Sequence, residues 1–183
     1  MKGLVLVGDY FEDVEFISPI DVWKRNKDSI VIASVMKRKE VVSKNGIKMV
    51  TDTLIENVNL TEFDFLFIPG GPGAFNILDK LKIVDEVIKY FAQNHKLLCA
   101  ICAAPLLLGK NGYLKNKNYT IYPGFENRVV GGNYLKQKGV VVDENYITGK
   151  SMYYSILLGL EVVKYFYGEE QKLELEKSLK GEK

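Results

Sequence analysis

The residue with the clearest chemical potential is Cys102, which follows the apolar run Leu97–Ile101 and precedes Ala103-Ala104-Pro105. The run predicts a buried strand, and the proline predicts the first turn of a helix. Small residues between them allow a sharp turn, the layout of a nucleophile elbow. A thiol at a helix start has its pKa lowered by the dipole and by unpaired N–H groups, which favours reactivity. A small buried hydrophobe at the end of a strand fits the same pattern, so the local sequence leaves both interpretations open.

A second cysteine, Cys99, makes the sequence Cys-x-x-Cys, which also occurs in redox dithiols. Three residues of extended chain span ~10 Å, and odd spacing directs the two side chains to opposite faces of a sheet. A disulfide needs Cα atoms within ~7 Å. We therefore expect Cys99 to be a core residue, and two cysteines in 183 residues do not form a disulfide framework.

A group of acids follows the first apolar run: Asp9, Glu12, Asp13 and Glu15. Acids at a helix start complement the helix dipole, and this accounts for most of the group. Glu15 differs because its neighbours Val14 and Phe16 are apolar, so its side chain is expected to point inward. Burial raises the pKa of a carboxyl, and a protonated carboxyl could donate a hydrogen bond to a thiolate.

The loop Pro69–Gly73 follows another apolar strand and includes Gly70 and Gly71. It matches neither the dinucleotide fingerprint nor the P-loop, so a nucleotide site is not expected. Glycines allow backbone N–H groups to approach an anionic centre, as an oxyanion hole requires. A tight turn that needs positive φ explains the loop as well and, taken alone, is the favoured interpretation.

The remaining composition excludes several classes of function. The one histidine, His95, is expected on the surface, so a Cys-His pair is not predicted and a cysteine protease or amidotransferase is disfavoured. One histidine and two separated cysteines predict no metal site. A net charge of +2 predicts no nucleic-acid partner. No stretch approaches the roughly 20 apolar residues of a membrane span, so we expect a cytoplasmic protein.

Apolar runs alternate with helical patterns along the chain, which predicts βαβ units and a single domain over residues 1–183. Expected strands are 4–7, 29–35, 63–68, 97–101 and stretches near 119–122, 139–143 and 145–148. Expected helices are 13–25, 80–94, 105–111 and 154–167. Residues 37–52 predict a polar hairpin or edge excursion with a turn at Asn45-Gly46. Residues 169–183 predict a charged terminal helix or tail that docks through Leu173, Leu175 and Leu179.

Strands that are apolar throughout are covered on both faces, so the fold class is a three-layer α/β/α sandwich with a mostly parallel sheet. Ligands of such folds bind beyond the C-terminal ends of the strands. Three features fall there: the Asp9–Glu15 loop, the Pro69–Gly73 loop and Cys102. The sheet topology therefore predicts one site that contains all three.

Motifs spread over about residues 1–168 resemble the DJ-1/ThiJ/PfpI family. They are Val14-Glu15 with Pro19–Val22, Phe67–Gly71, Ala100–Pro105, Tyr122–Glu126, and Val140–Asp143 running into Ile147–Gly149. The resemblance implies a flavodoxin-like sandwich and a homodimer. It assigns Cys102 as the reactive cysteine and Glu15 as the protonated acid at its sulfur. It also implies that amides of Gly70, Gly71 and Ala103 line the pocket.

Three positions depart from the family pattern. The protease-like branch has histidine directly after the cysteine, where this chain has Ala103. Many members place histidine twenty positions beyond the cysteine, where this chain has Tyr122, a further pocket residue. Gly149–Tyr153 replaces the usual Ser-Arg-Gly-Pro-Gly, which changes one pocket wall.

Two functions of different class follow from the resemblance. The first is a cofactor-free enzyme of the glyoxalase or deglycase type, acting through Cys102 on a small reactive aldehyde such as methylglyoxal or on a glycated adduct. The second is a non-enzymatic redox sensor or stress chaperone that uses oxidation of Cys102 under oxidative stress. Proteolysis and glutamine amidotransfer are the disfavoured alternatives.

Overall fold

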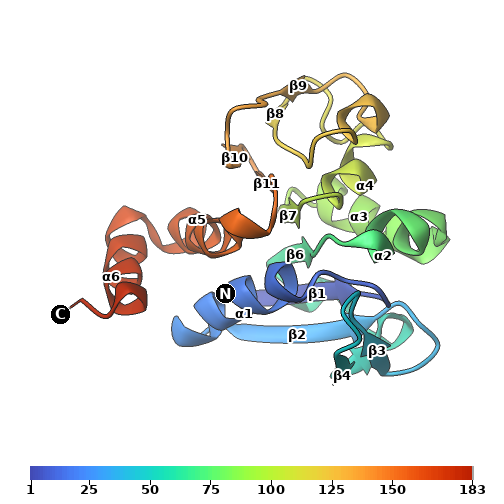
Figure 1. The fold of residues 1–183 in the computed structure, drawn as a ribbon, viewed down its shortest axis with the longest axis horizontal. Coiled ribbons are helices and arrows are strands. Elements are labelled where there is room, and N and C mark those ends of the chain that lie inside the picture. Colours follow the sequence, from blue (N-terminus) through green and yellow to red (C-terminus); the bar gives the residue numbers. More distant parts are fainter. Residues whose placement is uncertain (183) are drawn as a thin grey trace.

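The computed structural model describes residues 1–182, in which seven strands form one sheet in the order β10-β11-β7-β6-β1-β2-β5 (Figure 1). All neighbours are parallel except the hairpin of β10 and β11. The strands are β1 Lys2–Val7, β2 Ser29–Ser34, β5 Thr53–Leu54, β6 Phe65–Ile68, β7 Leu97–Ile101, β10 Val140–Asp143 and β11 Tyr146–Gly149. The predicted α/β class with a mostly parallel sheet is confirmed.

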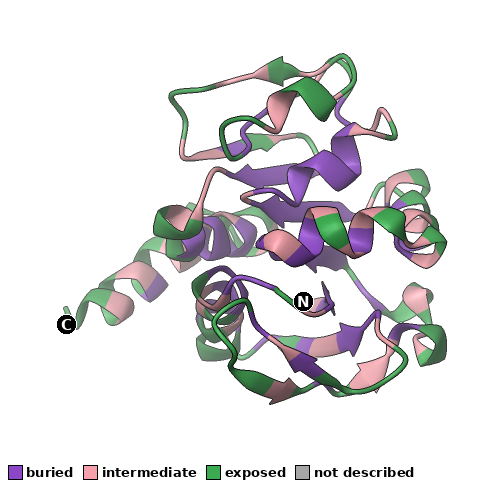
Figure 2. Cartoon of the chain, turned by 45° about the vertical axis from the view of Figure 1, so that its right-hand side comes forward, coloured by how far each residue is buried: buried purple, intermediate pink, exposed green. Residues whose placement is uncertain are grey.

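Two hydrophobic clusters cover the two faces of this sheet. Alternate residues of β1, β6 and β7 belong to each cluster, because successive side chains of a strand point to opposite faces. One cluster includes α1 (Asp13–Arg25) and α5 (Ser155–Tyr167), and the other includes α3 (Lys82–Gln93) and α4 (Pro105–Gly109). Figure 2 shows the buried strands between these outer layers. The three-layer arrangement follows from strands that are apolar on both faces.

Helices α1 and α5 pack closely at Gly159. A Cβ at this position would lie 3.1 Å from Val22 Cβ and 3.2 Å from Pro19 Cα. The indole Nε1 of Trp23 donates to the Gly159 carbonyl at 3.0 Å. This contact fixes α1, the helix that carries Glu15, against α5.

The polar excursion at 37–52 forms a hairpin, β3 (Glu40–Val42) with β4 (Lys48–Val50), outside the main sheet. Its tip is tied to the loop after β1, since Tyr10 N donates to Val42 O at 2.7 Å and Lys44 N donates to Phe11 O at 2.9 Å. The hairpin therefore lies beside the carboxyl ends of the strands, where the fold is expected to bind ligands.

Several elements differ from the sequence-based expectation. The strand expected at 119–122 is wrong for the main sheet, because β8 (Asn118–Tyr119) pairs only with β9 (Asn133–Tyr134). A short helix, α2 (Pro72–Asn76), follows the glycine loop and was not predicted. Helix α4 ends two residues earlier than expected. Short 3₁₀ turns connect the other elements, at Ile55–Asn57, Leu60–Glu62, Leu78–Lys80 (η3), Glu126–Arg128 (η4) and Met152–Tyr154 (η5).

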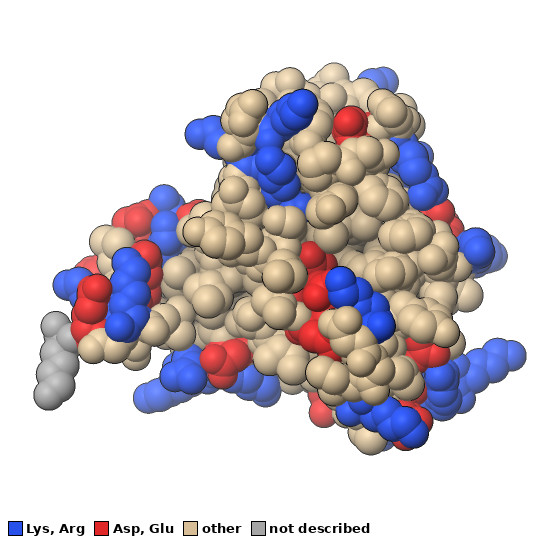
Figure 3. Space-filling model, viewed as in Figure 1, with Lys and Arg blue, Asp and Glu red and all other residues tan. Residues whose placement is uncertain are grey.

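The charged C-terminal segment is a helix, α6 (Glu169–Lys180), and residue 183 of the predicted range lies outside the described residues. Leu175 is buried and Leu179 packs against the α1/α5 cluster. Leu173 is 48% exposed, so its expected docking is wrong. Figure 3 shows the charged side chains of α6 at one end of the molecule, beside an uncharged area over α5. Within residues 1–182, no helix has both the length and the hydrophobicity of a membrane span.

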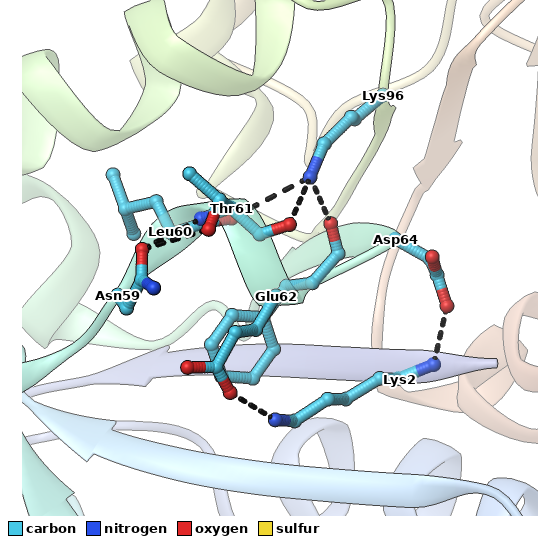
Figure 4. A network of polar contacts seen from close by, with 8 residues as sticks. Lys2, Asn59, Leu60, Thr61, Glu62, Asp64 and Lys96 are labelled. Atoms are coloured by element: carbon cyan, nitrogen blue, oxygen red, sulfur yellow. Dashed lines mark hydrogen bonds and ion pairs between the residues drawn. The ribbon is translucent and has the colours of Figure 1, made fainter.

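A polar network holds the amino ends of the central strands of the sheet (Figure 4). Lys96, just before β7, donates to the carbonyl oxygens of Phe63 at 2.5 Å and Thr61 at 3.2 Å. Lys2 donates through its backbone to Asp64 and through Nζ to Glu62, both at 2.6 Å. These contacts hold the amino ends of β1, β6 and β7 in position relative to one another. The carboxyl ends of the same strands are therefore also fixed relative to one another.

Candidate functional site

The turn at Cys102 has the predicted elbow geometry. Its φ is +62°, a left-handed conformation that costs a non-glycine residue about 1–3 kcal/mol. Two backbone hydrogen bonds hold it, from Cys102 N to Gly149 O at 2.8 Å and from Tyr122 N to Cys102 O at 2.9 Å. This left-handed turn places the thiol beyond the end of β7, before the helix begins.

The carboxyl of Glu15 faces this thiol from the first turn of α1. Its side chain is buried, with 2% of the residue exposed, and Oε2 has no hydrogen-bond partner among the described residues. Burial, reinforced by the negative charge of Glu12, raises the pKa of Glu15 to about 7, while Cys102, Lys44 and the Gly70 amide oppose the rise. A carboxyl with this pKa can hold or release a proton near neutral pH.

The pKa of the Cys102 thiol is raised to about 12, which contradicts the expectation of a lowered value. Burial is the largest cause, and the charge of an ionised Glu15 adds to it; the N–H groups of Gly71 and Ala103 act in the opposite direction. Helix α4 is too short, and begins too far along at Pro105, for its dipole to prevail. Protonation of Glu15 removes the opposing charge and supplies a donor, so the protonation states of the two groups are coupled.

The glycine loop is what allows the acid and the thiol to meet. A Cβ on Gly70 would lie 2.5 Å from Glu15 Oε2 and 2.6 Å from Cys102 Cβ. Gly71 has φ +93°, and its Cβ would lie 2.5 Å from Glu12 N. The loop is therefore a tight turn, and it also brings the N–H of Gly71 to the Cys102 sulfur and that of Gly70 to the Glu15 carboxyl. A role for these groups as an oxyanion hole stays a prediction.

Cys102 opens into a cavity of about 480 Å³. Five predicted or family-implied residues line it: Glu15, Gly71, Cys102, Ala103 and Tyr122, whereas Gly70 lies beneath its floor. Ser151 and Met152 line the wall that was expected to depart from the family pattern. Glu12 also lines it and belongs to the Asp9–Glu15 loop that was expected there, but three other side chains were not assigned to the site from the sequence: Lys44, Phe75 and Phe125.

Glu12 and the missed residue Lys44 form an ion pair at the cavity. Glu12 is 7% exposed and precedes α1, whereas Lys44 comes from the hairpin loop between β3 and β4. The hydrogen bond that the Lys44 ammonium donates to the Glu12 carboxylate raises the pKa of Lys44. No local pattern around Lys44 indicates this contact, since only the position of the hairpin brings the two side chains together.

The other candidate residues lie elsewhere. Cys99 is buried in the α1/α5 cluster, and burial raises its pKa well above the ordinary value, which confirms it as a core residue. His95 is exposed before β7, at the opposite end of that strand from Cys102. Residues 1–182 contain no group of three or more acidic, cysteine or histidine side chains placed to hold a metal ion.

Comparison with known proteins agrees with this geometry. Residues 1–165 match the sequence model of the DJ-1/PfpI family. The chain belongs to the DJ-1/PfpI family. This match confirms the resemblance read from the motifs.

Relatives and solved structures place the chain within the DJ-1/PfpI family. It is 32% identical to DJ-1 homolog B of Arabidopsis thaliana over 96% of its own length, but spans only 40% of that longer protein. It is 33% identical to a protein named deglycase from Pyrococcus abyssi, covering 82% of this chain and 90% of the relative. The structure of oxidised DJ-1 from Toxoplasma gondii superposes with a TM-score of 0.89 at 27% identity, covering 97% of each chain.

The structure also shows what two departures from the DJ-1/PfpI pattern do. Ala103 is 2% exposed, in the position where the protease-like branch has histidine. Tyr122, where many members have histidine, is 47% exposed and lines the cavity. The cavity therefore has a thiol, two carboxyls, a lysine and a phenol, and no imidazole among the described residues that line it.

Proposed function

We propose that this protein is a cysteine-dependent enzyme that acts on small reactive aldehydes without a cofactor. The observation that supports it best is the Cys102 thiol in an open cavity, with Glu15 on one side and the amides of Gly71 and Ala103 on the other. The relative named deglycase supports the same class of reaction. The proposed substrate is methylglyoxal, or an early glycation adduct made from it, and the product is a hydroxy acid.

The first step is the attack of sulfur on the aldehyde carbon. Ionised Glu15 accepts the thiol proton, a C–S bond forms, and the carbonyl π electrons move to oxygen. The amides of Gly71 and Ala103 stabilise that oxygen, and Glu15 returns the proton to it, which gives a hemithioacetal. Because the pKa of the thiol, about 12, lies above that of Glu15, about 7, the thiol proton moves as the C–S bond forms, and protonated Glu15 then readily returns it to the new oxyanion.

The second step moves hydrogen within the adduct. Glu15 takes the proton from the former aldehyde carbon while the neighbouring ketone oxygen gains a proton, which gives an enediol. Glu15 then delivers its proton to the former ketone carbon while the hydroxyl on the sulfur-bearing carbon loses its proton, which gives a 2-hydroxyacyl thioester. Water then cleaves the C–S bond and regenerates the Cys102 thiol. The sum is one dicarbonyl and one water converted to one hydroxy acid, so no external oxidant or reductant is consumed.

The test is lactate formation from methylglyoxal by the purified protein, compared with Cys102→Ser and Glu15→Gln. Cys99→Ser is the matched control, because it alters the other cysteine outside the cavity. We expect turnover by the wild type and the control and its loss in Cys102→Ser. Full turnover by Cys102→Ser would show that the sulfur is not the nucleophile.

A redox-sensing role is the second candidate, and the unpartnered Glu15 Oε2 favours it. Peroxide would oxidise the thiol to the sulfenate and, with a second equivalent, to the sulfinate. A protonated Glu15 and the two amides would hold the added oxygens. Mass spectrometry after mild peroxide should show a gain of two oxygens at Cys102 that is lost in Glu15→Ala. Oxidation spread equally over Cys99 and the methionines would exclude a sensor.

The family resemblance also suggests a homodimer. Exposed apolar side chains on α1, on η5 and at the start of α5 support it: Val14, Ile17, Met152, Tyr153, Ile156 and Leu157. Sedimentation velocity of the wild type and of Ile17→Lys would test this, with a shift toward the monomer expected in the variant. The cytoplasmic location stays a prediction from the sequence.

A further inference from the structure

The cavity at Cys102 is larger and more aromatic than a three-carbon dicarbonyl requires. Its volume of about 480 Å³ falls in the range of pockets that enclose drug-sized ligands, roughly 300–1,000 Å³. Phe75 and Phe125 pack against each other in the wall, with ring centroids 5.1 Å apart and planes inclined by 43°. Tyr122 and Met152 extend this apolar surface, so a small substrate would leave most of it uncovered.

The aromatic wall is held in place by contacts behind it. Phe75 belongs to α2, which runs into η3, and η3 carries Asp79. Phe125 caps η4, whose Arg128 donates to Asp79 at 2.6 Å, and Phe125 N donates to Tyr122 O at 3.3 Å. The two segments that carry the rings are therefore joined by an ion pair, and the wall is preorganised for a flat apolar group.

The charges at the cavity disfavour an anionic substrate. Lys44 is the cation that lines it, and Glu12 already neutralises that charge. A carboxylate or phosphate on the substrate would have to displace Glu12, which is 7% exposed, and leave it buried without a partner. The group that extends from the reacting carbonyl should therefore be uncharged.

We propose that this site prefers 2-oxoaldehydes with an uncharged aryl or bulky alkyl substituent over methylglyoxal, and that Phe75 and Phe125 determine this specificity. The inference rests on the proposed aldehyde activity and names its substrate class. The steps at Cys102 and Glu15 are unchanged: phenylglyoxal and water would give 2-hydroxy-2-phenylacetate through the same hemithioacetal and thioester. Only the substituent on the ketone carbon differs, and the two rings contact it.

The experiment compares kcat/KM for methylglyoxal, phenylglyoxal and 4-carboxyphenylglyoxal in the wild type and in ring variants. Aryl and alkyl glyoxals differ in intrinsic reactivity, so the decisive quantity is the phenylglyoxal-to-methylglyoxal ratio relative to the wild type. We expect Phe75→Ala and Phe125→Ala to lower this ratio about tenfold, because hydrophobic pockets discriminate substituents by about 10- to 200-fold. Phe75→Leu, which keeps an apolar side chain, should lower it less. Tyr165→Ala, an exposed aromatic of α5, is the matched control.

The outcomes separate this inference from the proposed function. The specificity would be overturned if the ring variants lost the same fraction of kcat/KM for phenylglyoxal and for methylglyoxal. It would also be overturned if the wild type had equal kcat/KM for 4-carboxyphenylglyoxal and phenylglyoxal. Either result would leave the aldehyde activity intact. If the wild type turns over none of the three, the proposed function fails, and binding of acetophenone and acetone to Cys102→Ser, followed by NMR, decides the ligand class. Tighter binding of acetophenone that weakens in Phe75→Ala supports an aryl pocket, and equal binding refutes it.

Discussion

Replacing Glu15 with glutamine should stabilise the protein at neutral and alkaline pH while removing its proton-transfer group. The residue is 2% exposed, and one carboxyl oxygen has no partner among the described residues. Burial is the main cause that raises the pKa of Glu15 from an ordinary 4.5 to about 7. Glutamine keeps the size and the donor capacity of the protonated acid, but it cannot ionise.

The magnitude follows from the linkage between proton binding and folding. The pKa of Glu15 is higher in the folded state than in the unfolded chain, so the folded state binds more protons between about pH 4.5 and 7. The stability that this carboxyl contributes is fully present below pH 4.5 and is lost as the pH rises through about 7. At ~1.4 kcal/mol for each pH unit, the loss amounts to about 3 kcal/mol in the wild type, and the Glu15→Gln variant avoids it.

The assay is urea unfolding of both proteins from about pH 4 to 9 at one fixed protein concentration, since association would change the apparent stability. The free energy of unfolding of Glu15→Gln minus that of the wild type should increase by about 3 kcal/mol across this range. Glu86→Gln, which alters an exposed carboxyl of α3, is the matched control. A difference that does not change with pH, or that decreases as the pH rises, would refute the assignment of Glu15 as a buried acid.

Three further perturbations test the geometry. Gly70→Ala should abolish turnover and destabilise the fold by about 1–3 kcal/mol, because the added Cβ would lie 2.5 Å from Glu15 Oε2. Activity assays and thermal unfolding measure the two effects. A fully active variant would contradict the close approach of Gly70 to Glu15. Iodoacetamide should label Cys102 in the native protein and Cys99 only in denaturant, as read by peptide mass spectrometry; equal labelling would mean that Cys99 is not buried. Asp79→Asn should lower the urea midpoint near pH 7, because Asp79 pairs with Lys110 at 3.1 Å and Arg128 at 2.6 Å. Burial opposes ionisation of Asp79, but these two cations lower its pKa below 3.8, so the deficit of the variant should shrink as the pH falls below that value.

The connection between the site and stability has a general physical origin. The Glu15 carboxyl and the Cys102 thiol are both placed where their charged forms are poorly solvated, which raises both pKa values. The left-handed conformation of Cys102 adds local strain. Two buried ionisable groups and a left-handed turn therefore make the site less stable than an apolar core of the same shape would be.

The sequence alone was sufficient to predict those features that depend on residues close together in the chain. Apolar runs such as Leu97–Ile101 are strands because only a sheet covered on both faces buries them, and the amphipathic period at 82–93 requires a helix. The turn at Cys102 follows from its position between a strand and a proline. The rule that parallel strands end at one edge then places Glu15, the glycine loop and Cys102 together.

The tertiary structure decided what depends on contacts between distant segments. Lys44 reaches Glu12 only because the β3–β4 hairpin folds back onto the loop after β1, and nothing near Lys44 in the sequence indicates it. Phe75 and Phe125 meet across 50 positions of chain through a helix and a 3₁₀ turn too short to have a periodic signal. The sign of the Cys102 pKa change was likewise not a local property, since burial and the charge of Glu15 outweigh the helix start. The sequence by itself determined the fold, because periodicity and strand order specify it, and the family resemblance singled out Cys102 and Glu15. Packing alone decided the charge and shape of the cavity around them.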